Sequence, residues 1–522
     1  MGPSSSERSD LWRRVTLGEQ LARSARQIPD VIAFKFEGRE RSYKDLDARV
    51  SAFANGLIER GLRLGDRVAV MMNNCLELPE IYLAICRAGG ICVPVNFRLK
   101  GPEVQYILSQ SGAAFAIVDA FAGPVVAPCE IVQSGSCRMI FRACPRLSPG
   151  GDDYDEILEA SSTSSPGIDV AETEPAFIMY TSGTTGRPKG AVLSHLNLFV
   201  NTVNMIAALE ISATDRRWLA GLPLFHIGGL NGLLPFLYLG GTSIILPTGG
   251  FDASEVASLF ERERITSCFF VPSQWQAICE EAKLGDADLC LERATWGASV
   301  CPPSIRDALH RTFPGVRTYN VFGQTEMSSI TCAMRADRFP DKQGSIGTPV
   351  PGVEVRIVDE EMRDVPTGET GEIIYRGPTV MQGYWQSPEQ TAAAFHEGWF
   401  RSGDLVRADE DGFLFVVDRR SDMIISGGEN IYCAEVEAVI DAHPAVREVA
   451  IVGGPHEKWV ETPIAFVVLR GGAMATESEI IAWCKDRLAS YKKPTQVRFV
   501  ADLPRNASGK VLKMELRKLL GS

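Results

Sequence analysis

The stretch YTSGTTGRPKG, at residues 180–190, follows an apolar run and holds three glycines, four aliphatic hydroxyl residues and one lysine. Glycines let the backbone approach a ligand closely, so a loop of this kind can turn its N–H groups toward phosphate oxygens. Lys189 adds a positive charge that suits a phosphate. Further donors would come from the hydroxyl side chains of Thr181, Ser182, Thr184 and Thr185. The stretch therefore indicates a phosphate-binding loop that follows a strand.

This loop differs from the Walker A loop of many nucleotide-binding proteins. In the Walker A motif a second glycine stands directly before the lysine, whereas here Pro188 occupies that place. Composition alone equally allows a flexible surface hairpin, so both interpretations stay open at this point.

Length and composition indicate an ordinary globular protein of several domains. With 522 residues the chain is too long to fold around a single hydrophobic core, which suggests two to four domains or subdomains. The formal net charge of −12 argues against a nucleic-acid binder, because such proteins carry basic surfaces. The 13 cysteines form no CxxC pair, as is typical of reduced thiols in the cytoplasm. The N-terminus lacks the apolar stretch of a secretory signal, so we expect a cytoplasmic protein.

A long segment without formal charge, residues 218–251, needs a separate explanation. It has enough residues to span a membrane, but Pro223, Pro235 and Pro247 interrupt it and it contains many glycines. Residues 242–245 form a β-branched, strand-like run. We expect a buried loop, a helix and a strand in succession rather than a transmembrane segment.

Strand-like and helical patterns alternate along the chain, for example at residues 67–71 and 76–88. This alternation predicts an α/β fold with βα units and mainly parallel sheets. A boundary near residue 420 would divide the chain into domains 1–420 and 421–522. Residues 485–518 hold 10 basic and 3 acidic side chains, which fits either a solvated face or a phosphate-attracting surface.

The motif YTSGTTGRPKG matches, position by position, the signature of the adenylate-forming superfamily of acyl-CoA synthetases, luciferases and peptide-synthetase adenylation domains. The resemblance extends from about residue 17 to residue 519, through further motifs in the same order. It implies a large N-terminal domain of several subdomains, with mainly parallel sheets packed with helices, and a small mobile α+β C-terminal domain. It also implies an AMP-forming ligase that uses ATP, Mg²⁺ and CoA on a carboxylic acid.

Three motifs resemble the family's nucleotide-binding elements. WGASVCP, at residues 296–302, resembles the turn that contacts adenine, and YNVFGQTE, at residues 319–326, resembles the motif that brings an aromatic ring to adenine and Glu326 to Mg²⁺. RSGDL, at residues 401–405, resembles the family's TGD motif, with a serine for threonine. The implied nucleotide contacts beyond the phosphate loop are Gly297, Ala298, Ser299, Asn320, Phe322, Gly323, Thr325, Asp404 and Arg419. Asp404 and Arg419 would bind the ribose, and Thr184 with Glu326 would complete an oxygen shell around Mg²⁺.

The motif PLFHIGG, at residues 223–229, resembles the family's acyl-pocket gate, with His226 as the gating side chain. The resemblance implies an acyl pocket around His226, Gly229, Leu230 and Trp275, with the helix after the motif lining the acyl tunnel.

Motifs near the C-terminus resemble those that serve the second half-reaction. SDMIISGGENIY, at residues 421–432, resembles the loop that forms part of the pantetheine tunnel after a domain rotation. Ser421 stands at the hinge, where the family usually has lysine or aspartate, and Lys510 in PRNASGKVLK matches the mobile lysine between carboxylate and α-phosphate, a position where a positive charge stabilises the transition state. The implied CoA contacts are Gly427, Gly428, Glu429, Tyr491 and Lys493.

The identity of the acid is less constrained. Domains that adenylate amino acids place an aspartate near the gate, whereas the surroundings of His226 are apolar. An uncharged acyl chain is expected, and the overall pattern resembles the fatty-acyl-CoA ligases of bacteria. Three alternatives stay open: an aryl acid as substrate, an acyl carrier protein in place of CoA, and a relic that only binds nucleotide.

Overall fold

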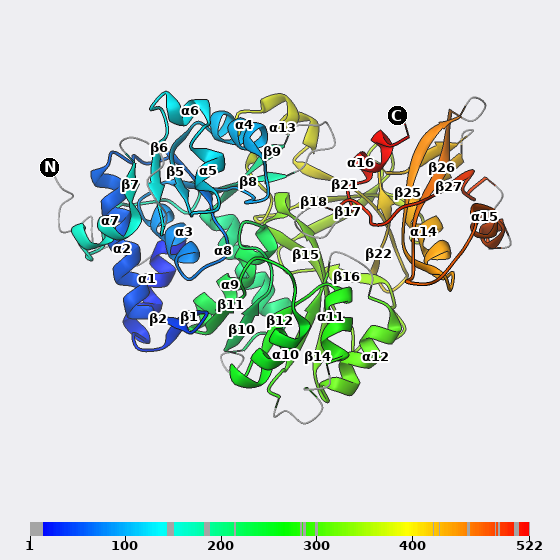
Figure 1. Cartoon of the computed structure of the whole chain (residues 1–522), viewed down its shortest axis with the longest axis horizontal. Helices are drawn as coiled ribbons and strands as arrows, with labels where there is room; N and C mark the ends of the chain where they lie inside the picture. Colours follow the sequence, from blue (N-terminus) through cyan, green and yellow to red (C-terminus); the bar gives the residue numbers. More distant parts are fainter. Residues whose placement is uncertain are drawn as a thin grey trace. The chain divides into compact units, whose positions relative to one another are not determined.

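The computed structural model describes residues 14–143, 151–181, 188–212, 216–281, 284, 289–297, 301–420, 422–426, 429–456, 460–485, 487–488, 491–505 and 511–520. The chain folds into two compact units. One comprises Met1–Glu354 and Arg376–Phe400, and the other comprises Val355–Tyr375 and Arg401–Ser522. The second unit thus includes residues before position 420, and the domain boundary at that position stays a prediction. Figure 1 labels the elements along the chain.

The first unit contains a sheet whose central strands are parallel, as the alternating pattern predicted. Its strand order is β19-β9-β8-β4-β3-β5-β6-β7, and β9 joins β8 in antiparallel fashion. The strands span Arg67–Met71 (β3), Ile91–Pro94 (β4), Ala113–Val118 (β5), Arg138–Phe141 (β6), Asp152–Asp153 (β7), Pro175–Thr181 (β8), Lys189–Ser194 (β9) and Gly383–Tyr384 (β19).

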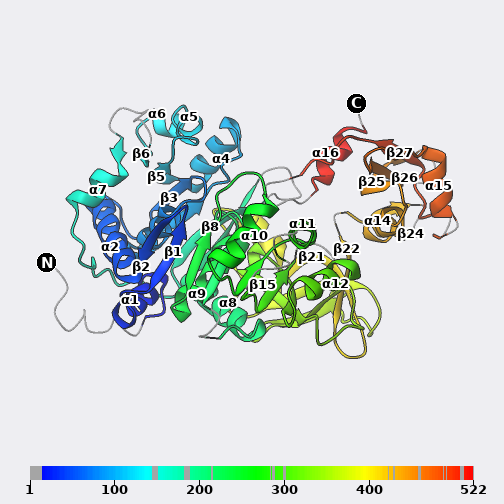
Figure 2. The same ribbon diagram turned by 60° about the horizontal axis from the view of Figure 1, so that its bottom comes forward.

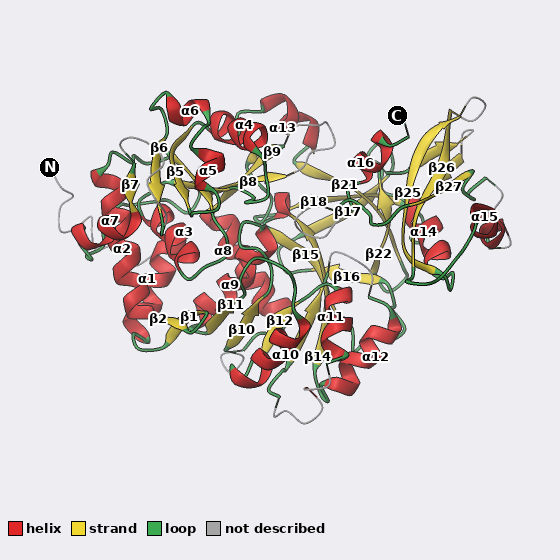
Figure 3. Ribbon diagram, in the orientation of Figure 1, coloured by secondary structure: helices red, strands yellow, loops and turns green. Residues whose placement is uncertain are grey.

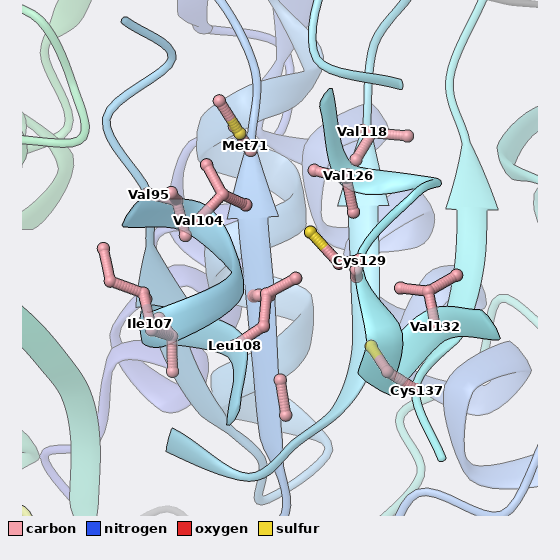
Figure 4. Packing of buried hydrophobic residues seen from close by; sticks show 14 of the residues in the cluster. Met71, Val95, Val104, Ile107, Leu108, Val118, Val126, Cys129, Val132 and Cys137 are labelled. Atoms are coloured by element: carbon pink, nitrogen blue, oxygen red, sulfur yellow. The ribbon is translucent and has the colours of Figure 1, made fainter. Parts of the chain in front are cut away.

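Apolar side chains on one face of this sheet form a closed core with three helices. Val104, Ile107 and Leu108 come from helix α4 and lie beside strand β3, near Met71 and Val95 (Figure 4). The three helices span Gly101–Ser111 (α4), Gly123–Val126 (α5) and Glu130–Gln133 (α6). Four other helices of this unit span Leu17–Gln27 (α1), Tyr43–Glu59 (α2), Glu77–Arg87 (α3) and Tyr154–Ala160 (α7). The buried apolar face holds the β8 end of the phosphate loop on a rigid sheet.

A second sheet in the same unit has the order β16-β15-β14-β13-β12-β10-β11-β1-β2. Its strands are parallel from β14 to β1 and antiparallel at both edges. The strands span Ile32–Phe36 (β1), Arg39–Ser42 (β2), Arg217–Ala220 (β10), Thr242–Ile245 (β11), Ser267–Phe269 (β12), Arg293–Trp296 (β13), Arg317–Gln324 (β14), Ser329–Arg335 (β15) and Ser345–Pro349 (β16). The remaining elements of this unit are α8 (His195–Ala208), α9 (Ile227–Leu239), α10 (Ala253–Arg262), α11 (Pro272–Cys279), α12 (Pro303–Thr312), the 3₁₀ turn η3 (Thr325–Met327), α13 (Pro388–Ala394) and β20 (Phe395–His396).

Helices α8 and α9 connect the two sheets of the first unit. They pack against each other, and α8 contacts β9 of one sheet and β15 of the other, an arrangement that Figure 2 shows beside β8 and β15. Polar side chains that point inward from these helices are therefore close to the loops of both sheets.

The segment without formal charge folds as predicted into a loop, helix α9 and strand β11. Helix α9 contains Pro235 and is buried along most of its length, and the Trp218 ring stacks on Phe236 with a centroid distance of 5.1 Å. Among the helices that the structure describes, none is both long and apolar enough to cross a membrane. Burial between two sheets explains the lack of charge.

The second unit contains two groups of strands. One has the order β17-β18-β21-β22, and the other has the order β24-β23-β26-β25 with β27 beside β26. The strands span Glu354–Val358 (β17), Gly371–Arg376 (β18), Trp399–Ala408 (β21), Leu414–Arg419 (β22), Ile424–Ser426 (β23), Glu429–Ile431 (β24), Val446–His456 (β25), Val460–Leu469 (β26) and Gln496–Phe499 (β27). Its helices, red in Figure 3, are α14 (Cys433–Asp441), α15 (Glu477–Lys485) and α16 (Lys513–Lys518). Separate apolar clusters join α14 and α15 to one face of the second group and α16 to the other, which confirms the predicted small α+β part.

Candidate active site

The two ends of the phosphate loop are held by a tight antiparallel pair of strands. Thr181, at the end of β8, lies opposite Lys189, at the start of β9. A Cβ atom on Gly190 would lie 2.6 Å from Ile178 Cγ2, so only glycine fits there. The Tyr106 hydroxyl donates to the Pro188 carbonyl at 3.2 Å and fixes the second end. Four predicted ligands lie outside the described residues, namely Ser182, Gly183, Thr184 and Thr185.

Glu326 lies in the short turn η3, is only 9% exposed, and meets the first end of the loop. Its Oε1 atom accepts hydrogen bonds from the Thr181 hydroxyl at 3.4 Å and from the Tyr384 hydroxyl at 3.1 Å. Burial, together with the negative charge of Glu326, raises the pKa of Tyr384, so this hydroxyl keeps its proton. The structure thus joins two predicted residues and adds Tyr384, which sequence reasoning missed.

The donor set around Glu326 fits a magnesium ion that arrives with a phosphate ligand. Within the described residues, both hydrogen bonds to this carboxylate reach Oε1 and none reaches Oε2. The described part of the chain contains no group of three or more acidic, histidine or cysteine side chains that could hold a metal. Mg²⁺ is often bound by one or two carboxylates, with phosphates and water as its other ligands. One carboxylate at the end of a phosphate loop suits that mode.

The backbone directly after Glu326 has an unusual conformation. Ser328 and Ser329 have φ angles of 62° and 119°, which side chains other than glycine rarely adopt. Asn231 of α9 donates to the Ser328 carbonyl and to Asn201 of α8. Asn201 donates to the Ile330 carbonyl at 2.9 Å. Two buried asparagines therefore hold the strained segment that follows the metal-binding candidate, and the sequence motifs gave no sign of them.

Several predicted adenine and phosphate contacts come from β14 and from the end of β13. A Cβ on Gly323 would lie 1.7 Å from the Ser329 carbonyl oxygen, and a Cβ on Gly297 would lie 2.6 Å from the Val321 carbonyl oxygen. Both glycines are thus required by close backbone packing. The Asn320 amide donates to the Ser345 carbonyl at 2.6 Å and is buried.

The remaining predicted contacts of this group differ in how the structure places them. Phe322 and Thr325 are half-buried. Ala298 and Ser299 lie outside the described residues.

His226 stands at the N-terminus of α9, at the end of a row of aromatic rings. Ring centroids are 5.4 Å apart for His226 and Phe225, 5.6 Å for Phe225 and Phe97, and 6.1 Å for Phe97 and Phe121. Burial lowers the pKa of His226, so its imidazole is neutral at neutral pH. The row runs from the exposed Phe121 to the half-buried histidine.

Two other residues predicted for the acyl pocket belong to α9 and serve its packing. A Cβ on Gly229 would lie 2.2 Å from the Pro223 carbonyl oxygen, so this glycine lets the helix contact the loop before it. Leu230 is buried and packs in an apolar interior lined by residues that include Leu17 and Phe34.

Trp275 of α11 is fully buried in an aromatic core. Its indole Nε1 donates to the Thr295 carbonyl at 3.0 Å. Its ring meets Phe270, Phe260 and Phe313, with centroids 5.4, 6.4 and 6.2 Å away. This environment explains Trp275 as a packing residue, and its assignment to the acyl pocket stays a prediction.

In the second unit, Asp404 and Arg419 lie opposite each other on β21 and β22. Arg419 Nε is 3.0 Å from Asp404 Oδ1. The Ser402 hydroxyl accepts from the Asp404 backbone N–H at 3.0 Å and donates to the Ile373 carbonyl at 2.5 Å. Either serine or threonine can make these backbone contacts, so the departure from the TGD motif preserves the turn.

Glu372 is a further residue of this turn that sequence reasoning missed. It is buried and accepts the Gly403 backbone N–H at 3.1 Å. Arg401 and Arg420 form ion pairs with it at 2.6 and 3.2 Å. A buried carboxylate with two arginine partners therefore fixes the backbone just before Asp404.

The residues predicted for CoA and for domain rotation are only partly described. Ser421, Gly427, Gly428 and Lys510 lie outside the described residues. Glu429 begins β24, where its backbone pairs with Ser426.

Two predicted CoA contacts lie in a basic stretch of the second unit. Tyr491 is 43% exposed, next to a lysine, Lys492, that pairs with Glu435 at 2.7 Å. Lys493 follows in the same turn. Other basic side chains of residues 485–518 also pair with carboxylates of the second unit, among them Arg505 with Glu448, Lys513 with Glu437, and Arg517 with Asp422. Much of the local basic excess is thus neutralised within this unit.

The order of these elements agrees with known families. The AMP-binding enzyme family matches residues 21–385, and the AMP-binding enzyme C-terminal domain matches residues 435–510. The chain belongs to the AMP-binding enzymes. As an adenylate-forming enzyme it is an AMP-forming acid–CoA ligase.

Relatives of similar length support this assignment. Feruloyl-CoA synthase from Amycolatopsis sp is 39% identical over 512 residues, which cover 98% of this chain and 100% of that protein. Indoleacetate–CoA ligase from Aromatoleum aromaticum is 36% identical over 97% of this chain and 98% of that one. The solved structure of O-succinylbenzoate coenzyme A synthetase from Bacillus subtilis, in complex with ATP and magnesium ion, has a TM-score of 0.84 and 30% identity, covering 96% and 99% of the two chains.

Proposed function

We propose that this AMP-binding enzyme activates an aromatic carboxylic acid with ATP and transfers the acyl group to CoA. The observation that carries this proposal is the match, over nearly the whole chain, to ligases named for feruloyl and indoleacetate groups. Both acids contain an aromatic ring. This differs from the fatty-acid substrate expected from the sequence, for which a charge-free pocket was the main argument.

The row of rings that ends at His226 supports an aromatic acid. Phe97, Phe225 and His226 form successive tilted and edge-on contacts, and such rings offer edges and faces on which a further ring can pack. A neutral His226 can donate a hydrogen bond to the carboxylate without holding it in a strong ion pair, which leaves the carboxylate able to attack.

The phosphates and their metal ion would be bound by two parts of the first unit. The loop from Thr181 to Lys189 would surround their oxygens, and Glu326 would hold Mg²⁺ with Thr184. A bound Mg²⁺ would neutralise charge on the phosphates during attack. Tyr384 and Thr181 hold Glu326 in place for this role.

Asp404 and Arg419 would bind the ribose of the nucleotide. An ionised carboxylate accepts hydrogen bonds from both ribose hydroxyls, and the guanidinium beside it restrains its orientation. The contacts with adenine and the α-phosphate would come from Gly297, Ala298, Ser299, Asn320, Phe322, Gly323 and Thr325.

The reaction would proceed in two steps. A carboxylate oxygen attacks the α-phosphorus, and the bond from that phosphorus to pyrophosphate breaks. The thiol sulfur of CoA then attacks the acyl carbon, loses its proton, and releases AMP. Lys510 would serve the first step. A rotation about Ser421 would then bring Gly427, Gly428 and Glu429 into place for the second step. Tyr491 and Lys493 would lie near the nucleotide end of CoA.

A competition assay tests the substrate class. The protein would receive ATP, Mg²⁺ and CoA with pairs of acids of equal carbon number, one aromatic and one straight-chain. We expect the aromatic acid to give at least about 10-fold higher kcat/KM, which corresponds to about 1.4 kcal/mol. Preference for the straight-chain acids would show that the substrate is a fatty acid instead. Thioester formation only with an added carrier protein would show that the acceptor is that protein rather than CoA.

A further inference from the structure

Tyr384 stands between two oppositely charged residues of the first unit. Its hydroxyl donates to Glu326 Oε1 at 3.1 Å, and the Lys189 ammonium nitrogen lies 5.1 Å from the centroid of its ring. The phenol thus contacts the proposed metal-binding carboxylate with its polar end and the loop lysine with its face.

This geometry has a physical consequence for both charges. A lysine and a glutamate that reach the same small region attract each other, and a direct ion pair would occupy both with each other. The negative face of an aromatic ring attracts an ammonium group, while a phenol hydroxyl donates to a carboxylate. One tyrosine can therefore satisfy both groups and still leave each able to bind a ligand.

The backbone holds Tyr384 firmly in this place. Strand β19 pairs with β9, where Tyr384 lies opposite Ala191. The Tyr384 N–H donates to the Thr391 hydroxyl at 2.9 Å, and the next N–H, of Trp385, donates to the Gly190 carbonyl at 2.7 Å. Tyr384 thus stands on the strand that pairs with β9, and β9 begins with Lys189.

We propose that Tyr384 is a positioning residue that keeps Lys189 and Glu326 apart. Through it, Glu326 stays available to the Mg²⁺ that ATP brings and Lys189 stays available to a phosphate oxygen. The inference rests on the proposed function for the nucleotide site, but it concerns neither the acid nor CoA.

The test compares three purified variants by calorimetric titration with a non-hydrolysable ATP analogue, with and without Mg²⁺. Tyr384→Phe keeps the ring and loses the hydroxyl, and Tyr384→Leu loses both. Tyr106→Phe is the matched control, because its hydroxyl contacts the Pro188 carbonyl of the same loop. Thermal unfolding of each variant reports whether the fold is intact.

We expect Tyr384→Phe to raise the Mg²⁺ concentration at half-saturation by about 10-fold, as for other partners of metal ligands, with metal-free binding unchanged. Tyr384→Leu should also weaken metal-free binding by about 3-fold, because Lys189 then pairs with Glu326. Tyr106→Phe should leave the Mg²⁺ dependence unchanged.

An unchanged Mg²⁺ dependence in Tyr384→Phe, or an equal change in Tyr106→Phe, would overturn the inference. Absence of nucleotide binding by the unaltered protein would instead overturn the proposed function. Because Tyr384→Phe removes a single oxygen atom, it decides the question even where Tyr384→Leu fails to fold.

Discussion

Asn74 accepts the backbone N–H of Leu224 on its Oδ1 atom at 3.0 Å, two residues before His226. The amide nitrogen of Asn74 donates to the Leu246 carbonyl at 3.0 Å and to the Leu222 carbonyl at 3.4 Å. Asn74 follows strand β3, so one buried side chain from the first sheet fixes the loop before α9 and the end of β11 from the second.

Replacement of Asn74 should therefore affect the acid more than ATP. Asn74→Ala leaves buried backbone groups without partners, at a cost of about 1–3 kcal/mol, and the loop that carries His226 would shift. We expect the KM for the acid to rise about 10-fold while the KM for ATP changes less than about 2-fold.

Asn73→Ala provides the matched control for this prediction. Asn73 contacts Asp119 and Thr248 at the same junction. If both variants change the two KM values alike, Asn74 acts only through the general stability of the junction.

Asp404 should discriminate ATP from 2′-deoxy-ATP. Asp404→Asn keeps the shape of the side chain but removes the charge that would accept the ribose hydroxyls, so we expect ATP to bind about 10-fold more weakly and the preference over 2′-deoxy-ATP to shrink. In the ion pair with Arg419, the arginine side chain is 42% exposed but the Asp404 side chain only 3%, so thermal unfolding is measured as well, to separate a loss of stability from a loss of ribose binding. Asp411→Asn, exposed in the turn between the same strands, should behave like the unaltered protein. A preserved preference in Asp404→Asn would argue against the ribose contact.

Replacement of Trp275 should lower the free energy of unfolding more than it changes the preference for a substrate. Because it is fully buried among three phenylalanines, Trp275→Ala should lower the free energy of unfolding by about 3–5 kcal/mol. Trp275→Phe should cost less and leave the KM for the acid unchanged. A large rise in that KM, without loss of stability in denaturant titration, would instead support the predicted place in the acyl pocket.

His195 should make the first unit less stable in mild acid. Burial lowers the pKa of His195 to about 4, and its Nδ1 accepts the Leu17 N–H at 3.4 Å. The unfolded chain binds this proton near pH 6.5, so the stability is fully present above that pH and is lost as the pH falls toward 4.

The expected loss for His195 at pH 5, relative to pH 8, is about 2 kcal/mol. His195→Gln removes the titrating group, so its stability should depend less on pH across this interval. Equal pH slopes for the two proteins in denaturant titrations would contradict the assignment.

The sequence predicted the fold well where the pattern that indicates an element lies within one continuous segment. Strand β3 has the predicted bounds, Arg67–Met71, and lies in a short apolar run that Asp66 precedes and Asn73 follows closely. The charge-free segment at residues 218–251 folds as predicted, because Pro223 lies in the loop before α9, Gly240 ends that helix and Pro247 follows β11. The family motifs singled out Thr181 and Glu326, and the structure brings these two side chains into contact, while their binding roles stay predictions.

The residues that the sequence did not reveal act through contacts between distant segments. Tyr384 reaches Glu326 from a two-residue strand, and Glu372 reaches Gly403 from another strand. Asn74 and Asn231 are polar residues that belong to none of the sequence motifs. Only the packing of α8, α9 and the two sheets shows which groups they bind. Trp275 is a different case, because the structure buries its side chain in an aromatic core while its predicted place in the acyl pocket stays a prediction.

The most direct test of the proposed function is a single turnover with an aromatic acid labelled with ¹⁸O on both carboxylate oxygens, in the presence of ATP, Mg²⁺ and CoA. If the carboxylate attacks the α-phosphorus and CoA then displaces AMP, mass spectrometry will find one ¹⁸O atom in AMP and one in the aryl-CoA thioester. Unlabelled AMP, or label in ADP or inorganic phosphate, would contradict an acyl-adenylate formed from an aromatic acid.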